Sequence, residues 1–418
     1  MKLKKIIRNI FSVRNDGTDK LIMLFGIPIR IDRSKYYKKI VDDTPVENNK
    51  IVFNNFQGSL YGCNPKYIAQ EIIKRGLPYK LFWICKGNND VNKDMFPKEI
   101  NLISFNGKEV IKTLSSAKAI ISNVRMNSFI LRGWYKKNEQ TYINTWHGSL
   151  GIKKIDAAVK GVSYADKKWC ATSKNYDSKY INYLLSNSTF ENKVFEDGMW
   201  YEGQILQTGH PRNDIFFKSD KEIEDIRNKV FNLLEIDTNK KMVLYVPSYR
   251  DDKRLDCYGL DADNLLNNLN EKFGQDWVLV VRMHPHLKKH TKNLFDIGEK
   301  VINASYYPDI QELLASSDIA ITDYSSCIFD FMLSRKPGFI FATDIEQFNT
   351  ERGFYYPLES TPFPISRTNE ELAKNIIDFD YEKYKNDVEQ FLKGKGCMED
   401  GHASERVVDL IEKIINQG

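Results

Sequence analysis

The sequence lacks the features that mark several large classes of protein. Its six cysteines are scattered singly, and no two stand at the two-residue spacing that zinc and redox sites use. The longest apolar run near the N-terminus covers residues 21–29, far short of the ~20 residues that a membrane span needs. There is no internal repeat and no low-complexity tract. We therefore expect a globular protein that stays in the cytoplasm, with reduced thiols and no bound metal.

A strong overall charge is also missing. The chain has 61 Lys and Arg against 56 Asp and Glu, a formal charge of +5, which does not predict binding to nucleic acid. The basic residues are concentrated at the start, because residues 1–40 hold eleven Lys or Arg and only three Asp. The basic character is thus a local feature of the N-terminus, and we expect no nucleic-acid partner.

The N-terminal segment has a helical pattern. Apolar residues recur at helical spacing, and basic residues lie between them on the other face: Leu3, Ile6, Ile7, Ile10 and Phe11 against Lys2, Lys4, Lys5 and Arg8. Such a helix over 1–12 could lie on an anionic membrane surface, where each basic group adds about 1 kcal/mol. Packing on the chain's own domain explains the pattern equally well. We interpret residues 1–40 as a basic amphipathic segment that associates with an anionic membrane.

From residue 50 onward, short apolar runs alternate with helical stretches, as in βα units around parallel sheets. The expected strands are 51–54, 80–85, 101–104, 119–123, 142–146, 168–172, 242–247, 277–283, 300–303, 319–322 and 338–342. A charged helical stretch over 218–234 separates two such series. The pattern predicts an α/β fold with an N-terminal domain over 41–220, a C-terminal domain over 221–395 and a terminal helix over 396–418. Two such domains would enclose a cleft.

A histidine follows the strand expected at 142–146. His147 could accept a proton from an attacking hydroxyl near pH 7, and the adjacent Gly148 allows a sharp backbone turn. Lys153 lies a few residues further on and suits an anionic substrate. A hydrogen-bonded histidine at a strand end, with no catalytic role, explains His147 alone about as well.

Two strands of the second series end in cations. The strand 277–283 ends in Arg282 and is followed by His284, and the strand 242–247 is followed by Arg250. Arg presents a planar fork to phosphate and His can donate to a phosphoryl oxygen, so both can stabilise charge that develops in phosphoryl transfer. These residues predict a phosphate site at the carboxyl ends of the strands.

Other polar residues at strand ends are individually weaker signals. The strand 319–322 is followed by a helix start, where serines either cap the helix or contribute to an anion site. The residues concerned are Asp323, Ser325 and Ser326. A similar group of polar residues follows Gly209 and consists of Arg212, Asn213 and Asp214.

One pair of acidic residues has the spacing of a possible metal site. Asp261 and Asp263 resemble the metal-binding carboxylates of sugar transferases, but they precede a helical stretch at 264–269. We interpret them as acidic residues that favour a helix N-terminus.

Taken in order, these motifs resemble the CDP-glycerol glycerophosphotransferase family, the teichoic acid primases and polymerases of Gram-positive bacteria. The resemblance covers about residues 50–395 and is carried by five short motifs. These are Thr145-Trp146-His147-Gly148, Pro211-Arg212-Asn213-Asp214, Arg282-Met283-His284-Pro285, Thr322-Asp323-Tyr324-Ser325-Ser326 and Arg352-Gly353-Phe354-Tyr355. Many relatives carry a Thr-Pro sequence after the His-Gly, whereas Ser149-Leu150-Gly151 follows here, which concerns the acceptor side.

The resemblance implies a GT-B architecture, with two Rossmann-like domains whose parallel sheets face a central cleft. His147 would be the general base on the acceptor hydroxyl, and His284 would contact the donor diphosphate. The implied donor-binding residues are Arg250, Arg282, Asp323, Ser325 and Ser326. The implied residues on the acceptor side are Trp146, Gly148, Ser149, Lys153, Arg212, Asn213 and Asp214.

The resemblance also implies the reaction. CDP-glycerol or CDP-ribitol would donate a polyol phosphate to a lipid-linked teichoic acid or capsule-type polymer at the cytoplasmic face of the membrane. CMP would leave, no cofactor would be obligatory, and turnover should resist EDTA. The nearest alternative is a GT-B glycosyltransferase that uses a nucleotide sugar and releases a nucleoside diphosphate. A non-catalytic, membrane-bound polymer-binding protein is the second alternative, although it leaves both histidines unexplained.

Overall fold

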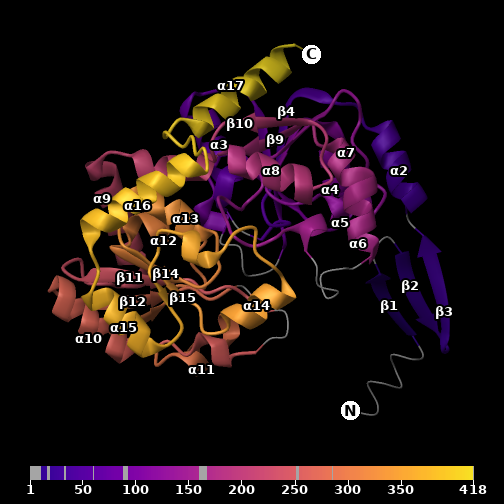
Figure 1. Ribbon diagram of the computed structural model, residues 1–418. Coiled ribbons are helices and arrows are strands. Elements are labelled where there is room, and N and C mark those ends of the chain that lie inside the picture. Colours follow the sequence, from indigo (N-terminus) through magenta and orange to yellow (C-terminus); the bar gives the residue numbers. More distant parts are fainter. Residues whose placement is uncertain are drawn as a thin grey trace.

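The computed structural model describes residues 11–16, 19–32, 34–59, 61–87, 93–159, 167–250, 254–284 and 286–417. Two large parallel sheets with flanking helices form the body of the molecule, and a small antiparallel sheet projects from it (Figure 1). The strands of both large sheets are joined through helical crossovers, as parallel pairing requires. The expected α/β class with two parallel sheets is confirmed.

The first large sheet has seven strands in the order β10-β9-β8-β7-β4-β5-β6. Their bounds are β4 (Glu47–Asn54), β5 (Lys80–Cys85), β6 (Ile100–Ser104), β7 (Ala117–Ser122), β8 (Thr141–Asn144), β9 (Tyr183–Ser186) and β10 (Gln204–Gln207). Successive side chains of a strand point to opposite faces, and both faces of this sheet are covered. In β4, for example, Val52 joins one apolar cluster while Ile51 and Phe53 join the other.

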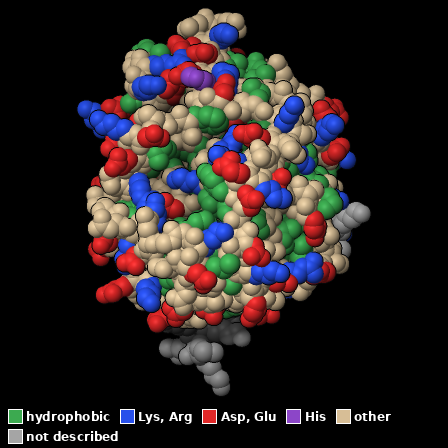
Figure 2. Space-filling view, turned by 60° about the vertical axis from the view of Figure 1, so that its left-hand side comes forward, with side chains coloured by type: hydrophobic (Ala, Val, Ile, Leu, Met, Phe, Trp, Pro, Cys, Tyr) green, Lys and Arg blue, Asp and Glu red, His purple; other side chains and the backbone are tan. Residues whose placement is uncertain are grey.

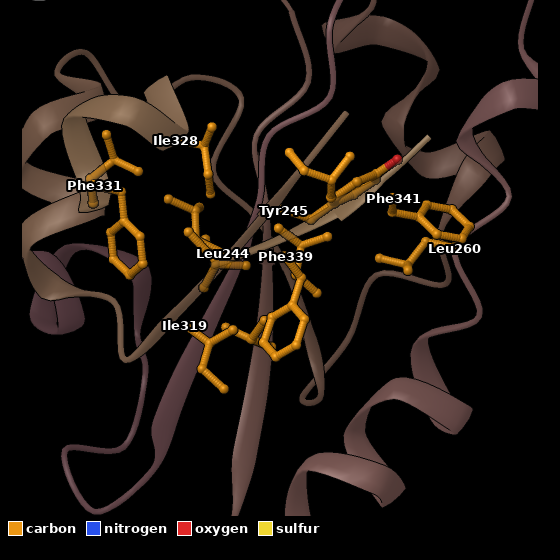
Figure 3. Packing of buried hydrophobic residues seen from close by; sticks show 14 of the residues in the cluster. Leu244, Tyr245, Leu260, Ile319, Ile328, Phe331, Phe339 and Phe341 are labelled. Atoms are coloured by element: carbon orange, nitrogen blue, oxygen red, sulfur yellow. The ribbon is translucent and has the colours of Figure 1, made fainter. Parts of the chain in front are cut away.

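The second large sheet has six strands in the order β13-β12-β11-β14-β15-β16. Their bounds are β11 (Lys241–Tyr245), β12 (Trp277–Val281), β13 (Val301–Asn303), β14 (Ile319–Thr322), β15 (Gly338–Phe341) and β16 (Ile365–Ser366). Figure 3 shows how Leu244, Ile319 and Phe339 of neighbouring strands pack with Ile328 and Phe331 of a covering helix. Burial of each such side chain contributes about 1.5–3 kcal/mol, which makes this sheet a rigid support for the loops at its ends.

Helices cover the sheets and begin at recognisable capping residues. The long α9 (Asp220–Leu234) starts at Ser219 with a capping box to Glu222. The side chain of Asp261 caps α10 (Ala262–Phe273), so its interpretation as a helix-start residue is confirmed. The other helices are α2 (Ser34–Asp43), α3 (Cys63–Lys74), α4 (Lys108–Ser116), α5 (Asn127–Ile130), α6 (Lys167–Thr172), α7 (Ser178–Tyr180), α8 (Thr189–Gly198), α11 (Thr291–Leu294), α12 (Ile310–Ser316), α13 (Cys327–Phe331), α14 (Ile345–Glu351), α15 (Asn369–Ile377), α16 (Tyr381–Gly394) and α17 (Ala403–Asn416).

The last helix returns to the first sheet. After α16, which packs in the core of the second domain, α17 crosses back and buries Val407, Val408 and Ile411 in the cluster that contains Phe53 (Figure 1). The carboxylate of Asp214 accepts hydrogen bonds from the first two backbone N–H groups of α17. The C-terminal end of the chain thus fastens the two domains together.

The N-terminal segment differs from its sequence interpretation. Residues 1–10 lie outside the described residues, but Phe11 and Ser12 belong to a strand, so the predicted helix over 1–12 is wrong at its C-terminal end. The strands β1 (Phe11–Asp16), β2 (Asp19–Leu24) and β3 (Ile27–Asp32) form the antiparallel sheet that projects from the body (Figure 1).

A second correction concerns residues 168–172, which were expected as a strand and form α6 (Lys167–Thr172). Short apolar runs do not distinguish the two structures by periodicity. None of the helices in the described part of the chain is long and apolar enough to cross a membrane. The face seen in Figure 2 carries Lys and Arg interspersed with Asp and Glu, so no large region of one sign dominates it.

Candidate active site

Polar side chains gather where strands of the two sheets end. In the first domain, His147 follows β8 three residues after its last strand residue, Asn144. In the second, His284 follows β12, and Asp323 directly follows β14. Because the carboxyl ends of parallel strands meet at one edge of a sheet, each set is brought to the cleft side of its domain.

The imidazole of His147 is fixed by the backbone beside it. Its Nδ1 lies 2.8 Å from the carbonyl oxygen of Asn123, which can only accept, so Nδ1 carries the proton and Nε2 carries the lone pair. The ring is also in edge contact with Phe56. The pKa of His147 is lowered to about 4, mainly by burial and to a smaller extent by the positive charges of Arg212 and Lys153, although the hydrogen bond to Asn123 opposes them. The group is therefore a neutral base at pH 7.

The backbone next to His147 is held in an unusual conformation. Trp146 has a φ of +50°, which a bulky residue adopts only under constraint, at a cost of about 1–3 kcal/mol. The side chain of Asn64 donates to the carbonyl oxygens of Thr145 and Trp146 and stabilises this turn. Gly148 is required because a Cβ there would lie 2.9 Å from the indole nitrogen of Trp146.

His284 is oriented by other means. Its ring stacks on Tyr249, with ring centres 5.2 Å apart, and its Nδ1 accepts a 3.3 Å hydrogen bond from the backbone N–H of His286. In the neutral ring, Nε2 therefore carries the proton and can donate to an anionic ligand. Burial lowers the pKa of His284 to about 4, with smaller contributions from His286 and Lys153.

Lys153 connects the two halves of the cleft. It comes from the loop after His147, yet its Nζ lies 3.4 Å from the hydroxyl of Ser248 at the end of β11. Its charge acts on both His147 and His284. Burial lowers the pKa of Lys153 to about 8, and the nearby Arg352 adds to this effect. An ammonium group so placed suits an anionic ligand between the two histidines.

Arg250 is engaged by acids of its own domain. Its guanidinium donates to Asp323 at 2.8 Å and to both oxygens of Asp344 at 2.8 and 2.9 Å. These carboxylates hold the pKa of Arg250 above its usual value, although burial opposes them. Asp323 also accepts from the backbone N–H of Ser248. Arg250 and Asp323 thus shape the loop after β11 rather than present open charges.

Arg282, in contrast, has no carboxylate in salt-bridge contact among the described residues. Its Nη1 donates to the carbonyl oxygen of Tyr307 at 2.5 Å, and burial lowers its pKa to about 10. Ser325 and Ser326 precede α13, and the side chain of Ser326 makes no capping hydrogen bond. A Cβ on Gly151 would lie 3.0 Å from the Cβ of Ser326, so this helix start touches the loop that follows His147.

The residues Arg212, Asn213 and Asp214 lie at the junction between the domains. Arg212 pairs with Asp330 of α13 at 2.9 Å and donates to the carbonyl oxygen of Gly148 at 2.8 Å. Asn213 joins Gln311 of α12 to the segment that precedes α17. The PRND motif therefore fixes the loop of His147 and the relative placement of the two domains, with Asp214 capping α17.

The loop from Gly148 to Ile155 is paired with a segment of the second domain. Lys153 forms an antiparallel bridge with Phe354, and the backbone N–H groups of Lys154 and Tyr355 donate across the pair to Gly353 and Ile152. Leu150 and Ile152 belong to the apolar core of the second domain. The base-bearing loop thus begins in one domain and is packed into the other.

Several residues that hold the site were not singled out in the sequence. They are Asn64, Asn123, Asp330 and Asp344, all of which act on His147, Arg212 or Arg250 from distant positions. Asp344 could have been suspected because it follows strand β15, whereas Asp330 lies inside a helix. Within the part of the chain that the structure describes, no three His, Cys, Asp or Glu residues lie close enough together to hold a metal ion.

Two parallel α/β domains with imidazole, guanidinium and ammonium groups at their facing strand ends define a protein of the GT-B class of folds. The chain belongs to the CDP-Glycerol:Poly(glycerophosphate) glycerophosphotransferase family, whose model matches residues 36–413. The resemblance noted in the sequence is therefore confirmed.

Individual relatives agree with this assignment. The chain is 30% identical to the teichoic acid poly(glycerol phosphate) polymerase of Staphylococcus epidermidis over 100% of this chain and 60% of that polymerase. It is 29% identical to the polymerase of the same name from Bacillus subtilis over 91% of this chain and 51% of that protein. The chain thus spans between half and three fifths of the length of these two polymerases.

The fold is that of a solved relative. The structure of the wall teichoic acid polymerase TagF aligns with a TM-score of 0.78 and 29% sequence identity, over 92% of this chain and 94% of that chain. The expected GT-B arrangement is confirmed by this likeness.

Proposed function

We propose that this chain transfers glycerol phosphate from CDP-glycerol to a terminal hydroxyl of a teichoic acid-type acceptor. The observation that carries the proposal is the arrangement around Lys153. The charge of its ammonium group acts on two histidines that are neutral at pH 7, one with a lone pair at Nε2 and the other with a proton there. A hydroxyl nucleophile and a CMP leaving group call for two such complementary groups, a base for the hydroxyl proton and a donor to the phosphate oxygens.

The reaction balances without a further reactant. The acceptor oxygen forms a bond to the phosphorus that bears glycerol, and the bond from this phosphorus to the oxygen bridging it to CMP breaks. The hydroxyl proton passes to Nε2 of His147, and CMP leaves with the electron pair. His284, Arg282 and Lys153 stabilise the negative charge that grows on the phosphate oxygens. The proton leaves His147 for solvent before the next cycle.

A cavity beside His284 suits the nucleoside of the donor. It measures about 610 Å³ and is lined by Tyr249, Leu255, His286, Leu287 and His290. Aromatic and aliphatic side chains in such a cavity can stack on a pyrimidine base. A cytidine placed there would put its diphosphate next to His284 and Arg282.

A donor panel tests the proposal. The full chain is incubated with a glycerol phosphate-primed acceptor and CDP-glycerol, CDP-ribitol or a UDP-sugar, and products are separated by mass. We expect CMP release matched by glycerol phosphate increments on the acceptor, with CDP-glycerol preferred. Release of a nucleoside diphosphate would support the glycosyltransferase alternative, and absence of any transfer would support the polymer-binding one.

We further propose that the projecting N-terminal sheet holds the enzyme at the cytoplasmic face of an anionic membrane. The hairpin turn exposes 76% of Phe25, and β3 exposes 65% of Ile27, 42% of Ile29 and 44% of Ile31. These isoleucines alternate along β3 and so share one face of the sheet. Basic residues of β3 and the adjacent α2 can face anionic headgroups: Arg30, Lys35, Lys38 and Lys39.

Sedimentation with vesicles tests this attachment. Phe25→Asp combined with Ile27→Asp should abolish binding to vesicles that contain phosphatidylglycerol, because burial of each apolar side chain contributes about 1.5–3 kcal/mol. The control is Leu233→Asp, since Leu233 of α9 is 59% exposed but lies far from the hairpin in the chain. Equal binding of the double variant and the control would contradict the proposal.

A further inference from the structure

A chain of buried and half-buried hydrogen bonds runs from the loop of His147 to the segment before α17. The hydroxyl of Ser149, two residues after His147, accepts a 2.8 Å hydrogen bond from Nδ2 of Asn187. The same Nδ2 donates to Oε1 of Glu399 at 2.9 Å. Ser149 and Asn187 belong to the first domain, and Glu399 lies in the stretch that joins α16 to α17. The chain therefore connects the base-bearing loop to a remote part of the sequence.

Glu399 is the point at which several segments meet. Its carboxylate accepts from the backbone N–H of His210 at 3.1 Å and from Nδ2 of Asn213 at 2.8 Å, in addition to Asn187. Ser149, Asn187 and Asn213 are buried and Glu399 is half-buried, so water has limited access to these hydrogen bonds. Loss of the negative charge at Glu399 would weaken all of them together.

The charged and titratable groups around Glu399 come from three elements. His210 lies at the start of the PRND turn and bonds Glu191 of α8 through Nε2 at 2.8 Å. Arg406 of α17 and Cys397 on the same segment are the other neighbours whose charges interact with Glu399. Burial raises the pKa of Glu399 to about 7, although His210 and the surrounding donors oppose this effect. Both protonation states are thus accessible near neutral pH.

The network has the atoms for a second arrangement. Oδ1 of Asn187 and Nδ1 of His210 are buried and have no hydrogen-bond partner among the described residues. When Glu399 is protonated, rotation of the Asn187 amide lets Oδ1 accept from the carboxylic acid. Oδ1 then also faces Ser149, whose hydroxyl must donate where it previously accepted. The amide group of Asn187 thus couples the protonation of Glu399 to the loop of His147.

We propose that Glu399 is a positioning residue that sets the loop of His147 through Asn187 and Ser149, with its ionised form holding the productive arrangement. The kinetic consequence rests on the proposed glycerol phosphate transfer. Glu399 does not contact substrate, and its effect falls on kcat rather than on the KM for CDP-glycerol, because the donor residues belong to the other domain.

The pH dependence of Glu399→Gln tests this role. In the wild type, kcat should rise several-fold between pH 6 and pH 8 with an apparent pKa near 7. In Glu399→Gln, which keeps the size but not the charge, kcat should stay at the low level across this range with an unchanged KM. Ser149→Ala interrupts the same chain of hydrogen bonds at its other end and should also remove this step, the rise in kcat between pH 6 and pH 8.

Asp400→Asn is the matched control, because Asp400 is the neighbouring acid and pairs with Arg406 at the surface. It should follow the wild-type profile. A step near pH 7 that survives in Glu399→Gln overturns the proposal, as does an equal loss in Asp400→Asn. If Glu399→Gln does not fold by circular dichroism, a step retained in Ser149→Ala overturns it.

A readout without turnover separates this inference from the proposed function. The ¹⁵N signals of His147 in histidine-labelled protein should shift with an apparent pKa near 7 in the wild type and not in Glu399→Gln. If no CDP-glycerol is turned over, the proposed function fails while this titration still decides the coupling. Absence of the shift in the wild type contradicts the coupling itself.

Discussion

The two histidines of the cleft are held in opposite ways. His147 donates through Nδ1 to a carbonyl oxygen, in a strained turn that contacts from both domains stabilise. His284 accepts at Nδ1 from a backbone N–H and rests on the ring of Tyr249. The first arrangement leaves a lone pair at Nε2 and the second leaves a proton there.

This difference supports the proposed division of roles between the two rings. A lone pair fixed in space can remove the proton of an acceptor hydroxyl, whereas a fixed N–H can stabilise a phosphate oxygen. Burial keeps both rings neutral by lowering their pKa values, and the charge of Lys153 acts on both in the same direction. The surroundings of each ring, rather than the residue type, decide its role.

The largest effect is expected at His147. Replacement His147→Ala should lower kcat by about 10²–10⁴ because no other group would take the proton in the transition state. The KM for CDP-glycerol should change little, since the donor residues are untouched. His147→Gln should not restore activity, because an amide is no base at neutral pH. Steady-state assays of CMP release measure both constants, and full activity in either variant would contradict the assignment.

Arg212→Met removes the clamp on the loop of His147 while leaving His284 alone. It strands the buried carboxylate of Asp330, so the free energy of unfolding should fall by about 3–5 kcal/mol. Denaturant unfolding measures this change. Arg367→Met is the control, because the pair of Arg367 with Glu346 is exposed and should contribute less than about 1 kcal/mol. Similar losses of unfolding free energy in both variants would contradict a larger contribution of the buried Arg212–Asp330 pair.

His284→Ala should lower kcat by about 10²–10³, a smaller loss than in His147→Ala. This is the usual effect of removing one donor to a charge that develops in the transition state. Here the contrast with His147 becomes sharp. His284→Gln retains an N–H and should recover part of the activity in the same assay. If His147→Gln were more active than His147→Ala, and His284→Gln no more active than His284→Ala, the two roles would be reversed.

The smallest expected effect concerns the alkaline limb of the pH profile, where kcat/KM falls as the pH rises. Lys153 has a pKa lowered to about 8, so it is charged below this pH and loses its charge above it. We therefore expect kcat/KM to fall above pH 8 in the wild type. Lys153→Arg stays charged and should move this limb beyond pH 10, with little change at pH 7. If Lys153→Arg left the alkaline limb unchanged, the limb would belong to the titration of another group.

Much of the scaffold could be predicted from the sequence, because buried parallel strands are short apolar runs with clear ends. The strands β5 and β14 were predicted with their observed bounds. Residues 168–172 were assigned wrongly because a run of five residues fits a strand or a helical turn. The N-terminal hairpin was not predicted, because the helical spacing was read on residues 3–11, of which only Phe11 belongs to the hairpin.

The site was harder to predict than the fold. His147 and His284 were proposed as site residues because each follows a strand end, and that position is visible in the sequence. Arg212 and Arg250 carried the same signal, yet each is buried against a carboxylate, Asp330 or Asp344, that lies about a hundred residues away in the chain. A single sequence does not reveal such long-range pairs, and it reveals nothing of which ring nitrogen of a histidine carries the proton.

That proton distribution is the most direct test of the account. The chain has six histidines, so two-bond ¹H–¹⁵N correlations on histidine-labelled protein can resolve them, with His147→Asn and His284→Asn assigning two signals. At pH 7 we predict that both rings are neutral, with the proton on Nδ1 in His147 and on Nε2 in His284. The same tautomer in both rings, or a positively charged ring at either position, would contradict the division of roles.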